Sequence, residues 1–330
     1  MRTMLAVKIA GPLEATQWPR PVPGKGQVLL RIHASGLNPL DTKIHAGEAA
    51  HARHPLPAVL GLDLAGTVLA IGAGADRFRP GDQVYGLPGG VGGLQGSLAE
   101  YAAVDADLLA HKPMNLPMRE AAALPLIVIT AWEGLVDRAR VKPGDTVLVH
   151  GGAGGVGHVA VQIAVALGAQ VYATGTAAQA GIIRSYGATA IDYTAETVEQ
   201  YVARCTGGEG FDVVYDTVGG PVLDNSFKAA RMYGGHVVSC LGWGTHALAP
   251  LSFRAATYSG VFSLIPMLTG QGRRQHGDIL REVTRLVEAG KLLPRVTPER
   301  FGLDHAGDAL ALVATGRATG KVVVDIATPA

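Results

Sequence analysis

The sequence predicts an α/β protein of two domains, one rich in β-strands and one built on a doubly wound parallel sheet of six strands. From residue 4 to about residue 110, short apolar runs are interrupted by Gly and Pro. From Asp145 onward, β-rich runs alternate with helical segments at regular intervals. The first pattern is typical of a small antiparallel barrel or sandwich, and the second of a parallel sheet covered by helices on both faces. A length of 330 residues fits about two domains.

The first domain is expected to contain five strands: Met4–Ile9, Gln27–Ala34, Gly66–Ile71, Gln83–Leu87 and Ser97–Val104. Two long loops, at residues 47–57 and 86–96, separate them, and the second is Gly-rich and expected to be mobile. Beyond the second domain, the helices Asp278–Ala289 and Asp304–Thr315 and the strand Lys321–Ile326 are expected to return the chain to the first. Asp304 is the expected N-cap of its helix.

The second domain begins near residue 118, where residues 119–138 predict one or two helices. Its six expected parallel strands are Thr146–His150, Gln170–Thr174, Thr189–Asp192, Asp212–Asp216, His236–Leu241 and Tyr258–Leu264. The crossover helices are expected at Val156–Leu167, Ala178–Tyr186, Ala195–Cys205 and Pro221–Met232. The predicted domains are therefore 1–117 together with 266–330, and 118–265.

Composition narrows the possible functions. A hydrophobic content of 48% with 17% charged residues indicates a folded chain, and a net charge of +1 favours neither nucleic acid nor an anionic membrane as a partner. The longest apolar run, residues 121–132, is too short to cross a bilayer, and the first ten residues do not form a secretory signal. Two cysteines cannot build a disulfide framework or a four-thiolate metal site, so we expect a reduced, cytoplasmic setting.

The strongest motif joins the first parallel strand to its helix. Gly152, Gly154 and Gly157 satisfy G-x-G-x-x-G directly after the strand that ends at His150. Such glycines permit a tight turn, close approach of a pyrophosphate and close helix–strand packing, while the helix start donates backbone N–H groups to the phosphates. The motif predicts a dinucleotide site that includes Gly152, Ala153, Gly154, Gly155, Val156 and Gly157.

The residues at the end of the second parallel strand determine whether NAD or NADPH is preferred. In an NAD site a carboxylate there binds the ribose 2′-hydroxyl, but the segment Val171–Thr176 has none. NADPH is therefore favoured, and Thr176, Gln179, Arg184 and Tyr193 are the nearby groups able to bind its 2′-phosphate. Gly175 is predicted to belong to the same cofactor site. Arg184 is alternatively an ordinary solvated helix residue.

Ligands of open α/β sheets bind at the carboxyl ends of the strands. Thr217 and Val218, after the fourth strand, are predicted to flank the adenine or ribose. Further residues are predicted to lie near the nicotinamide, namely Leu241, Gly242, Phe262 and Leu264. Each of these six is alternatively a packing residue. Cys240 is expected to be a buried structural thiol.

Several motifs together resemble the medium-chain dehydrogenase/reductase superfamily. They are Asn38–Asp41, Gly61–Gly66, Gly74 with Phe78–Gly86, Gly96–Tyr101, His150–Ala164 and the terminal Gly320–Val324. Within the superfamily, the chain resembles the zinc-independent quinone oxidoreductase branch, which includes the plant enone and alkenal reductases. The resemblance covers essentially the whole chain and implies a GroES-like catalytic domain, a Rossmann domain, a homodimer and NADPH-dependent reduction.

The resemblance also locates the zinc ligands of related enzymes. Asn38 and Leu62 stand where those enzymes carry a cysteine and a histidine, and residues 86–96 lack the four cysteines of their structural zinc site. His45, His51 and His54 are interpreted as members of a solvated polar loop without a helix or strand to fix them. We therefore predict no metal.

Without a Lewis acid, hydride addition to a conjugated carbonyl or quinone is favoured over alcohol oxidation. The resemblance places Asn38, Asp41 and Thr130 beside the nicotinamide. It also places Lys43 there, where quinone reductases of the branch have a tyrosine and plant enone reductases a lysine. Lys43 either binds the enolate oxygen, binds cofactor hydroxyls, or is a surface lysine at the edge of the site. Gln179 stands where many relatives have a lysine that pairs with the 2′-phosphate.

Three alternatives remain open from the sequence. A trans-2-enoyl thioester reductase would use the same hydride addition, but it needs a basic groove that the near-neutral charge does not favour. A zinc-free alcohol dehydrogenase-like protein, or a sensor that binds NADPH without turnover, also fits.

The apolar last strand of the sheet, Tyr258–Leu264, predicts pairing of two copies across a two-fold axis.

Overall fold

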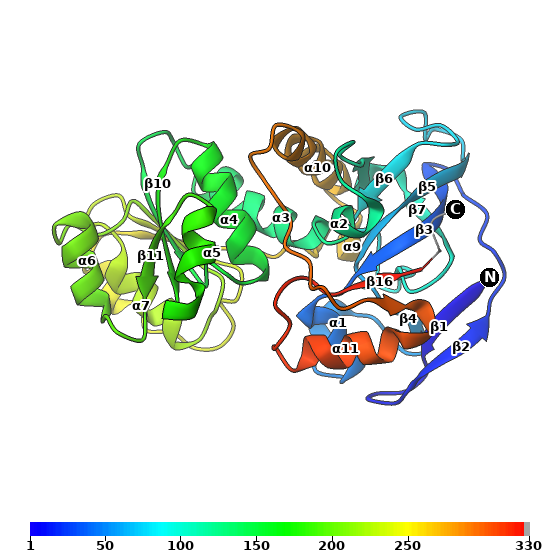
Figure 1. The fold of residues 1–330 in the computed structure, drawn as a ribbon, viewed down its shortest axis with the longest axis horizontal. Coiled ribbons are helices and arrows are strands. Elements are labelled where there is room, and N and C mark those ends of the chain that lie inside the picture. The colour runs from blue at the N-terminus through cyan, green and yellow to red at the C-terminus, as the bar shows by residue number, and fades with distance from the viewer. Residues whose placement is uncertain (327–330) are drawn as a thin grey trace. The chain divides into compact units, whose positions relative to one another are not determined.

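The computed structural model describes residues 1–326, and these form two compact units (Figure 1). Unit 1 contains Met1–Leu126 and the residues from Leu264 onward, and unit 2 contains Ile127–Ser263. The first boundary lies after the position expected from the sequence, because helix α2 (Met118–Ala121) packs on three strands of unit 1. In addition, the Leu126 N–H donates to Asp63 Oδ1 at 2.8 Å.

Unit 1 is β-rich, as predicted. A three-stranded sheet has the order β2 (Leu13–Gln17), β1 (Arg2–Ala6), β4 (Ala58–Val59). A seven-stranded sheet has the order β15 (Phe301–Gly302), β16 (Val323–Asp325), β3 (Gln27–Gly36), β5 (Asp63–Ile71), β6 (Gln83–Gly86), β8 (Leu109–His111), with β7 (Tyr101–Asp105) also paired to β3. Strand β2 escaped prediction because it is largely exposed and has no apolar alternation.

Alternation along β3 builds the core of unit 1. Val28, Leu30 and Ile32 are fully buried and pack with Leu64 and Val68 of the neighbouring β5. Helices lie around the sheets: α1 (Pro39–His45), α9 (Ile265–Thr269), α10 (Arg273–Glu288) and α11 (Ala306–Ala314), with single 3₁₀ turns at Ala50–Ala52, Ala106–Leu108 and Leu303–His305.

Two local predictions in unit 1 need correction. Asp304 is not the N-cap of α11: it lies in the 3₁₀ turn before that helix and pairs with Arg2, while His305 occupies the cap position. The Gly-rich loop 86–96, expected to be mobile, is largely buried. Its Gly96 N–H donates to the carbonyl oxygen of Val59 at 3.0 Å, so the loop packs against β4.

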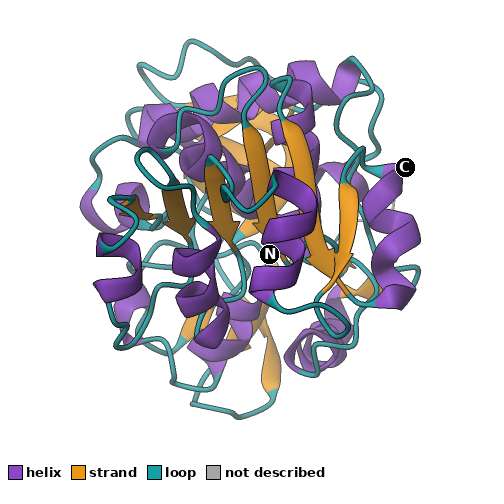
Figure 2. Cartoon of the chain, turned by 90° about the vertical axis from the view of Figure 1, so that its left-hand side faces the viewer, coloured by secondary structure: helices purple, strands orange, loops and turns teal. Residues whose placement is uncertain are grey.

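Unit 2 confirms the doubly wound sheet. Its six strands are all parallel, in the order β11 (Thr189–Asp192), β10 (Gln170–Gly175), β9 (Thr146–His150), β12 (Val213–Asp216), β13 (His236–Ser239), β14 (Thr257–Gly260). Helices cover both faces of this sheet, as Figure 2 shows. They are α3 (Pro125–Trp132), continued by a π-helical segment (Glu133–Arg138), then α4 (Gly155–Ala166), a 3₁₀ turn (Ala177–Gln179), α5 (Ala180–Ser185), α6 (Val198–Thr206), α7 (Pro221–Ala229) and α8 (Ala249–Ser252).

The last two strands are shorter than expected. Strand β13 ends at Ser239 instead of the predicted Leu241, and β14 ends at Gly260 instead of the predicted Leu264. The Val261 N–H still donates to the carbonyl oxygen of Ser239 at 2.9 Å, but the chain then leaves the sheet and leads into α9. The apolar composition of residues 261–264 fits a buried loop as well as a continued strand, so composition alone did not distinguish the two.

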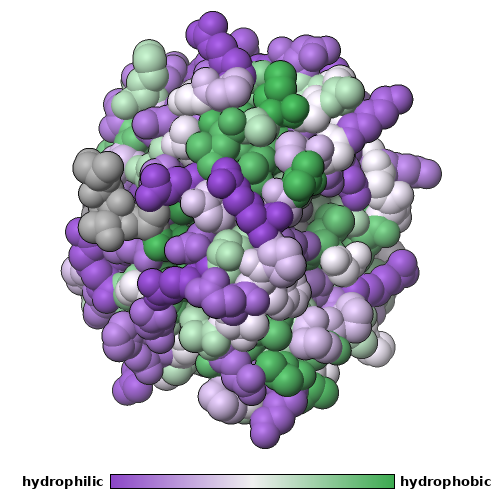
Figure 3. Space-filling model, turned by 90° about the vertical axis from the view of Figure 1, so that its right-hand side faces the viewer, coloured by the Kyte–Doolittle hydropathy of each residue, from purple (hydrophilic) through white to green (hydrophobic). Residues whose placement is uncertain are grey.

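Figure 3 shows one face of the molecule, on which hydrophilic and apolar residues are interspersed in small patches. Within residues 1–326, the structure contains no helix with the length and apolar character needed to cross a membrane.

Candidate functional site

The glycine motif forms the expected strand–turn–helix. Strand β9 ends at His150, Gly151 turns the chain with φ of +73°, and α4 begins at Gly155. A Cβ on Gly157 would lie 2.0 Å from the Gly151 carbonyl oxygen, and one on Gly152 would lie 2.5 Å from Ala173 Cβ. Only glycine therefore fits at these two positions. The first backbone N–H groups of α4 have no partner within the helix, so this end can bind an anion.

A groove of about 760 Å³ adjoins the turn within unit 2. Its volume lies within the usual range for small-molecule sites. The residues that line it are His150, Gly151, Ala153, Gly154, Thr174, Gly175, Gln179, residues 193–199, Tyr201, Val218, Val222, Asn225 and Lys228. Of the predicted cofactor contacts, Ala153, Gly154, Gly175, Tyr193 and Val218 therefore meet at one site.

Other predicted residues shape this groove without lining it. Thr176 caps the turn before α5, and its N–H binds Gln179 Oε1 at 3.0 Å, so the Gln179 amide is engaged within the protein. The Thr217 hydroxyl donates to the His150 carbonyl oxygen at 2.6 Å. Arg184 is exposed on α5 and does not line the groove.

The residues predicted to lie near the nicotinamide are not brought into this groove. Leu241 N–H binds the Ser239 hydroxyl at 3.0 Å, and a Cβ on Gly242 would meet the Tyr258 hydroxyl at 2.1 Å. Phe262 packs edge-on against Trp243, with ring centroids 5.8 Å apart. Leu264 is buried and belongs to unit 1.

Thr130 lies on α3 and is almost fully buried. Its hydroxyl lies 3.2 Å from Ser263 Oγ, and its carbonyl oxygen accepts a hydrogen bond from Tyr215 at 2.7 Å. Thr130 therefore also helps to join α3 to the sheet of unit 2.

Asn38 lies in a buried polar network of unit 1. Its Nδ2 donates to Asp63 Oδ2 at 2.9 Å, and its Oδ1 accepts a hydrogen bond from the ammonium of Lys321. The same ammonium donates to the Leu37 carbonyl oxygen at 2.9 Å and lies 3.5 Å from Asp63 Oδ2. Asn38 and Asp63 are at most 1% exposed and Lys321 is 7% exposed, so no bulk solvent screens these charges. The Asn38 amide is thus held on both sides by protein groups.

Asp41 anchors the start of α1. One carboxylate oxygen accepts from the Asn38 N–H at 2.8 Å, and the other accepts from the Gly61 N–H at 3.0 Å. The side chain is fully buried, so its geometry favours a positioning role over direct contact with a cofactor.

The network holds three ionisable groups out of water. Burial raises the pKa of Asp63, and Lys321 and the Asn38 amide oppose this rise. Burial also raises the pKa of Asp41, to about 7, against the hydrogen bond from Asn38. It lowers the pKa of Lys321, which the two carboxylates counteract. Each charge is therefore tolerable only while its partners stay in place.

The residues at the zinc positions of related enzymes do not fit a zinc ion. Asn38 is engaged by Asp63 and Lys321, Leu62 is a fully buried aliphatic side chain, and a buried ammonium lies beside them. Among residues 1–326, no three His, Cys, Asp or Glu side chains are grouped so that they could hold a metal.

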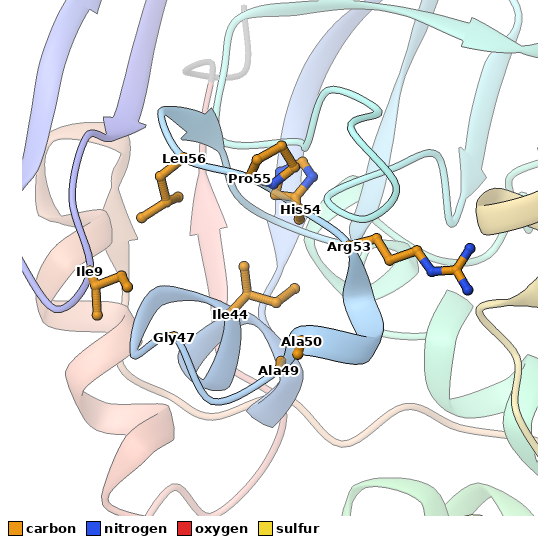
Figure 4. Close-up of a pocket in the computed structure, with 9 residues that line it drawn as sticks. All are labelled: Ile9, Ile44, Gly47, Ala49, Ala50, Arg53, His54, Pro55 and Leu56. Carbon is orange, nitrogen blue, oxygen red and sulfur yellow. The ribbon is translucent and has the colours of Figure 1, made fainter.

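Lys43 is an exposed residue of α1, and its neighbour Ile44 is buried. Ile44 helps to line an apolar pocket of about 620 Å³ (Figure 4). Ile9, Ile44 and Leu56 surround this pocket, whereas Arg53 extends away from the other labelled side chains.

The three histidines near this pocket are not simply solvated. His45 belongs to α1 and its Nε2 lies 2.7 Å from the Gly11 carbonyl oxygen. His54 is partly buried, with Nε2 3.3 Å from the Val59 carbonyl oxygen. His51 lies in the 3₁₀ turn Ala50–Ala52, so the loop does contain a helical turn, contrary to expectation.

A β-rich unit joined to a six-stranded parallel unit, with a glycine turn opening onto a groove, defines a class of two-unit dinucleotide-binding oxidoreductases. The glycine cradle fits a nicotinamide dinucleotide: Gly151, Ala153 and Gly154 would bind its pyrophosphate, and the groove would accept its nucleoside half.

Comparison with known proteins agrees with this class. Residues 24–114 match the alcohol dehydrogenase GroES-like domain, and residues 186–324 match the zinc-binding dehydrogenase family. The chain is 39% identical to the 2-methylene-furan-3-one reductase of Solanum lycopersicum, over 90% of this chain and 71% of that protein. It is 38% identical to the chloroplastic NADPH-dependent alkenal/one oxidoreductase of Arabidopsis thaliana, over 90% of this chain and 72% of that protein.

Solved structures show the same fold. An alcohol dehydrogenase superfamily protein from Novosphingobium aromaticivorans is 55% identical with a TM-score of 0.97, over 99% of this chain and 100% of that one. The quinone oxidoreductase of Pseudomonas syringae pv. Tomato DC3000 is 28% identical, with a TM-score of 0.83 over 98% of this chain and 99% of that one. The CurK enoyl reductase is 27% identical, with a TM-score of 0.85 over 99% of both chains.

The chain belongs to the medium-chain dehydrogenase/reductase superfamily. Unit 1 is its GroES-like domain and unit 2 its Rossmann domain. It is an oxidoreductase that uses a nicotinamide cofactor.

The sequence missed two kinds of site residue. Lys321 was predicted only as part of a terminal strand, because no local pattern in the sequence indicates that its ammonium is buried beside Asn38. His150 and Tyr201 had been read as ordinary strand and helix residues, yet both line the groove. Burial lowers the pKa of His150 to about 4, so its ring is neutral at pH 7.

Replacing Lys321 tests the network. Lys321→Met should lower the free energy of unfolding by about 3–5 kcal/mol, because Asp63 is left buried without its cation. Lys112→Met should cost less, since the Lys112 ammonium is bonded to the Pro113 and Leu116 carbonyls. Adding Asp63→Asn to Lys321→Met should restore part of the stability. Chemical denaturation measures all three variants, and equal losses for the two single variants would contradict the assignment.

Gly157→Ala tests the turn. The added Cβ forces the backbone of the Gly151 turn to move, so the free energy of unfolding should fall by about 1–3 kcal/mol and nicotinamide dinucleotide binding should weaken with it. Gly181→Ala is the matched control, because the space around that helical glycine is open. Denaturation and fluorescence titration would measure the two effects. Unchanged binding by the Gly157 variant would rule out the turn as the pyrophosphate site.

Zinc independence is a further prediction from the donor set at positions 38 and 62. Purified protein should contain no stoichiometric zinc, and EDTA should leave nicotinamide oxidation intact. Elemental analysis and an EDTA-treated assay measure this. Activity that is lost with EDTA and regained with zinc would refute it.

Proposed function

We propose that the chain is an NADPH-dependent, zinc-independent reductase of electron-poor conjugated acceptors, with enones and alkenals as its main substrates and quinones as a second class. The observation that carries the proposal is the combination of a dinucleotide turn with a GroES-like unit whose positions 38 and 62 hold no zinc ligand. Two relatives that share 38–39% identity over 90% of this chain bear the names of a furanone reductase and an alkenal/one oxidoreductase.

NADPH is proposed over NADH for an electrostatic reason. Strand β10 ends at Gly175 without a carboxylate that would repel a 2′-phosphate, and Lys228 of α7 brings a cation to the same groove. Two acidic residues also line the groove: Glu196 accepts two hydrogen bonds of 2.8 Å from Arg204, and Glu199 shares the groove with Lys228. Tyr193 supplies a hydroxyl group, whereas the Thr194 hydroxyl donates to Asp192 at 2.6 Å.

The chemistry follows from what the residues can stabilise. Gly151, Ala153 and Gly154 would hold the pyrophosphate of the dinucleotide, whose reduced nicotinamide would supply a hydride to the β-carbon of the conjugated carbonyl. Negative charge then develops on the carbonyl oxygen, which requires a hydrogen-bond donor. Asn38 is buried and held by Asp63 and Lys321, whereas the Lys43 ammonium is exposed on the anchored helix α1, so Lys43 is the proposed donor. The α-carbon takes its proton from solvent.

The proposed function is tested with purified protein, NADPH and a panel of enones, alkenals and quinones. NADPH oxidation should be fastest with short enones or alkenals. Fluorescence titration should show tighter binding of NADPH than of NADH. Binding without turnover of any acceptor would support a sensor instead, and equal or tighter NADH binding would overturn the cofactor assignment.

The substitution Lys43→Met distinguishes a loss of enolate stabilisation from a loss of cofactor binding. Turnover with enones should fall by roughly 10²–10³-fold, as when one oxyanion donor is removed, while NADPH binding stays within a few-fold. Lys25→Met is the control, because Lys25 is an exposed lysine of the same unit. If the Lys43 variant reduces enones at the parent rate, the donor must be sought among backbone N–H groups or ordered water.

A second candidate is reduction of trans-2-enoyl thioesters, which uses the same hydride addition. The structural likeness to the CurK enoyl reductase, at 27% identity, favours including it. A crotonyl thioester of coenzyme A added to the same panel decides between the two. A thioester reduced with a higher kcat/KM than any enone would make this the primary activity.

We also propose that two copies pair through the edge of the unit 2 sheet. Strand β14 is the last strand of that sheet, and three of its four residues are exposed, including Tyr258. An uncovered edge is a template for uncontrolled strand pairing, which a two-fold partner would prevent. Light scattering should give the mass of a dimer at micromolar concentration, and a monomer there would refute this.

A further inference from the structure

Two buried polar atoms of the groove in unit 2 have no hydrogen-bond partner within the described chain. They are Nε2 of His150, at the end of β9, and the hydroxyl of Tyr201, on α6. Both residues line the groove although they are only 4% and 2% exposed. Buried polar groups are nearly always paired, so two orphans in one groove indicate a missing partner.

The two residues lie on one side of the sheet. Side chains alternate along a strand, so His150 points to the same face as Leu148, and Thr174 to the same face as Tyr172. Leu148 and Tyr172 belong to the apolar cluster that also contains Tyr201. His150, Thr174 and Tyr201 therefore form a polar floor where that cluster meets the groove, and the more exposed Tyr193 and Val218 stand at its rim.

The contact with Thr174 allows His150 Nε2 to act as a donor. Thr174 Oγ1 accepts from the Gly151 N–H at 3.1 Å and lies 3.3 Å from His150 Nδ1. The Thr174 hydroxyl can donate its hydrogen to Nδ1. In that tautomer of the neutral ring the other nitrogen, Nε2, carries the hydrogen. The floor then offers a donor at His150 and a rotatable hydroxyl at Tyr201.

We propose that His150 Nε2 and the Tyr201 hydroxyl recognise the edge of the cofactor's purine base. The proposal rests on the proposed function, since it requires the nucleoside half of NADPH to occupy this groove. A purine fits because its flat faces can pack on the rim, which carries Tyr193 and Val218, while its nitrogen-bearing edge meets the floor. Adenine N1 can accept a hydrogen bond from His150 Nε2, and the 6-amino group can donate one to the Tyr201 hydroxyl.

Tyr201→Phe removes only the orphan hydroxyl. NADPH and adenosine 2′,5′-bisphosphate should each bind about 5–10-fold more weakly by calorimetry, which corresponds to one lost hydrogen bond. The thermal midpoint of the ligand-free protein should stay constant or rise, because an unpaired group has been removed.

Tyr172→Phe is the matched control. Tyr172 belongs to the same cluster, but its hydroxyl donates to the Cys205 carbonyl oxygen at 3.3 Å and it does not line the groove. This variant should lower the thermal midpoint and leave nucleotide binding unchanged. If Tyr201→Phe loses as much thermal stability as Tyr172→Phe, or binds both ligands as the parent does, the proposal is overturned.

The base itself is tested on the parent protein with NADPH and its hypoxanthine analogue. Hypoxanthine carries a hydrogen on N1, so it cannot accept from His150, and it should bind about 5–10-fold more weakly than NADPH. Equal affinities would overturn the assignment to the base edge. Normal NADPH binding without reduction of any acceptor would defeat only the proposed function, whereas absence of NADPH binding would defeat both.

Discussion

The buried ammonium of Lys321 is the interaction on which the candidate site of unit 1 depends. It joins the Leu37 carbonyl, the Asn38 side chain and the Asp63 carboxylate, which come from the end of β3 and the start of β5. Asp63 in turn accepts from Leu126, at the entrance to α3. One charge thus fixes three segments around a single point, where apolar packing would leave their polar groups unpaired.

This arrangement changes how Asn38 should be understood. The resemblance to zinc-independent reductases suggested an amide free to meet the cofactor, but both ends of the amide are held by Asp63 and Lys321. Its backbone N–H is also occupied, by Asp41. Asn38 is the N-cap of α1, so these contacts hold the start of the helix that carries Lys43, the donor proposed above. A rigid support would suit that proposed role, since the effect of an electrostatic donor depends on a constant position.

The parts of the structure that sequence could predict are those specified by local pattern. The six parallel strands and the turn at Gly152, Gly154 and Gly157 follow from periodicity and from positions that only glycine can fill. The polar network could not be predicted in this way, because Lys321 and Asn38 are 283 positions apart and only the fold brings them together. His150 and Tyr201 could not be predicted in this way either. Each is distinguished by one buried polar atom that has no hydrogen-bond partner among the described residues, and only the fold shows this. The end of β14 at Gly260 was not predicted, because the mainly apolar residues after it fit a continued strand as well as a buried loop.

The placement of Lys321 after unit 2 in the sequence affects how the protein is made. Synthesis proceeds from the N-terminus, so Asn38 and Asp63 leave the ribosome long before the lysine that neutralises them. Unit 2 is continuous in sequence and can fold during translation, whereas unit 1 must wait for β16, which pairs with β3. In the interval Asp63 cannot be buried at low cost, because its cation is not yet available. A strand that is made after the whole of unit 2 therefore completes the unit that was started before it, so the correct assembly of unit 1 depends on synthesis of β16.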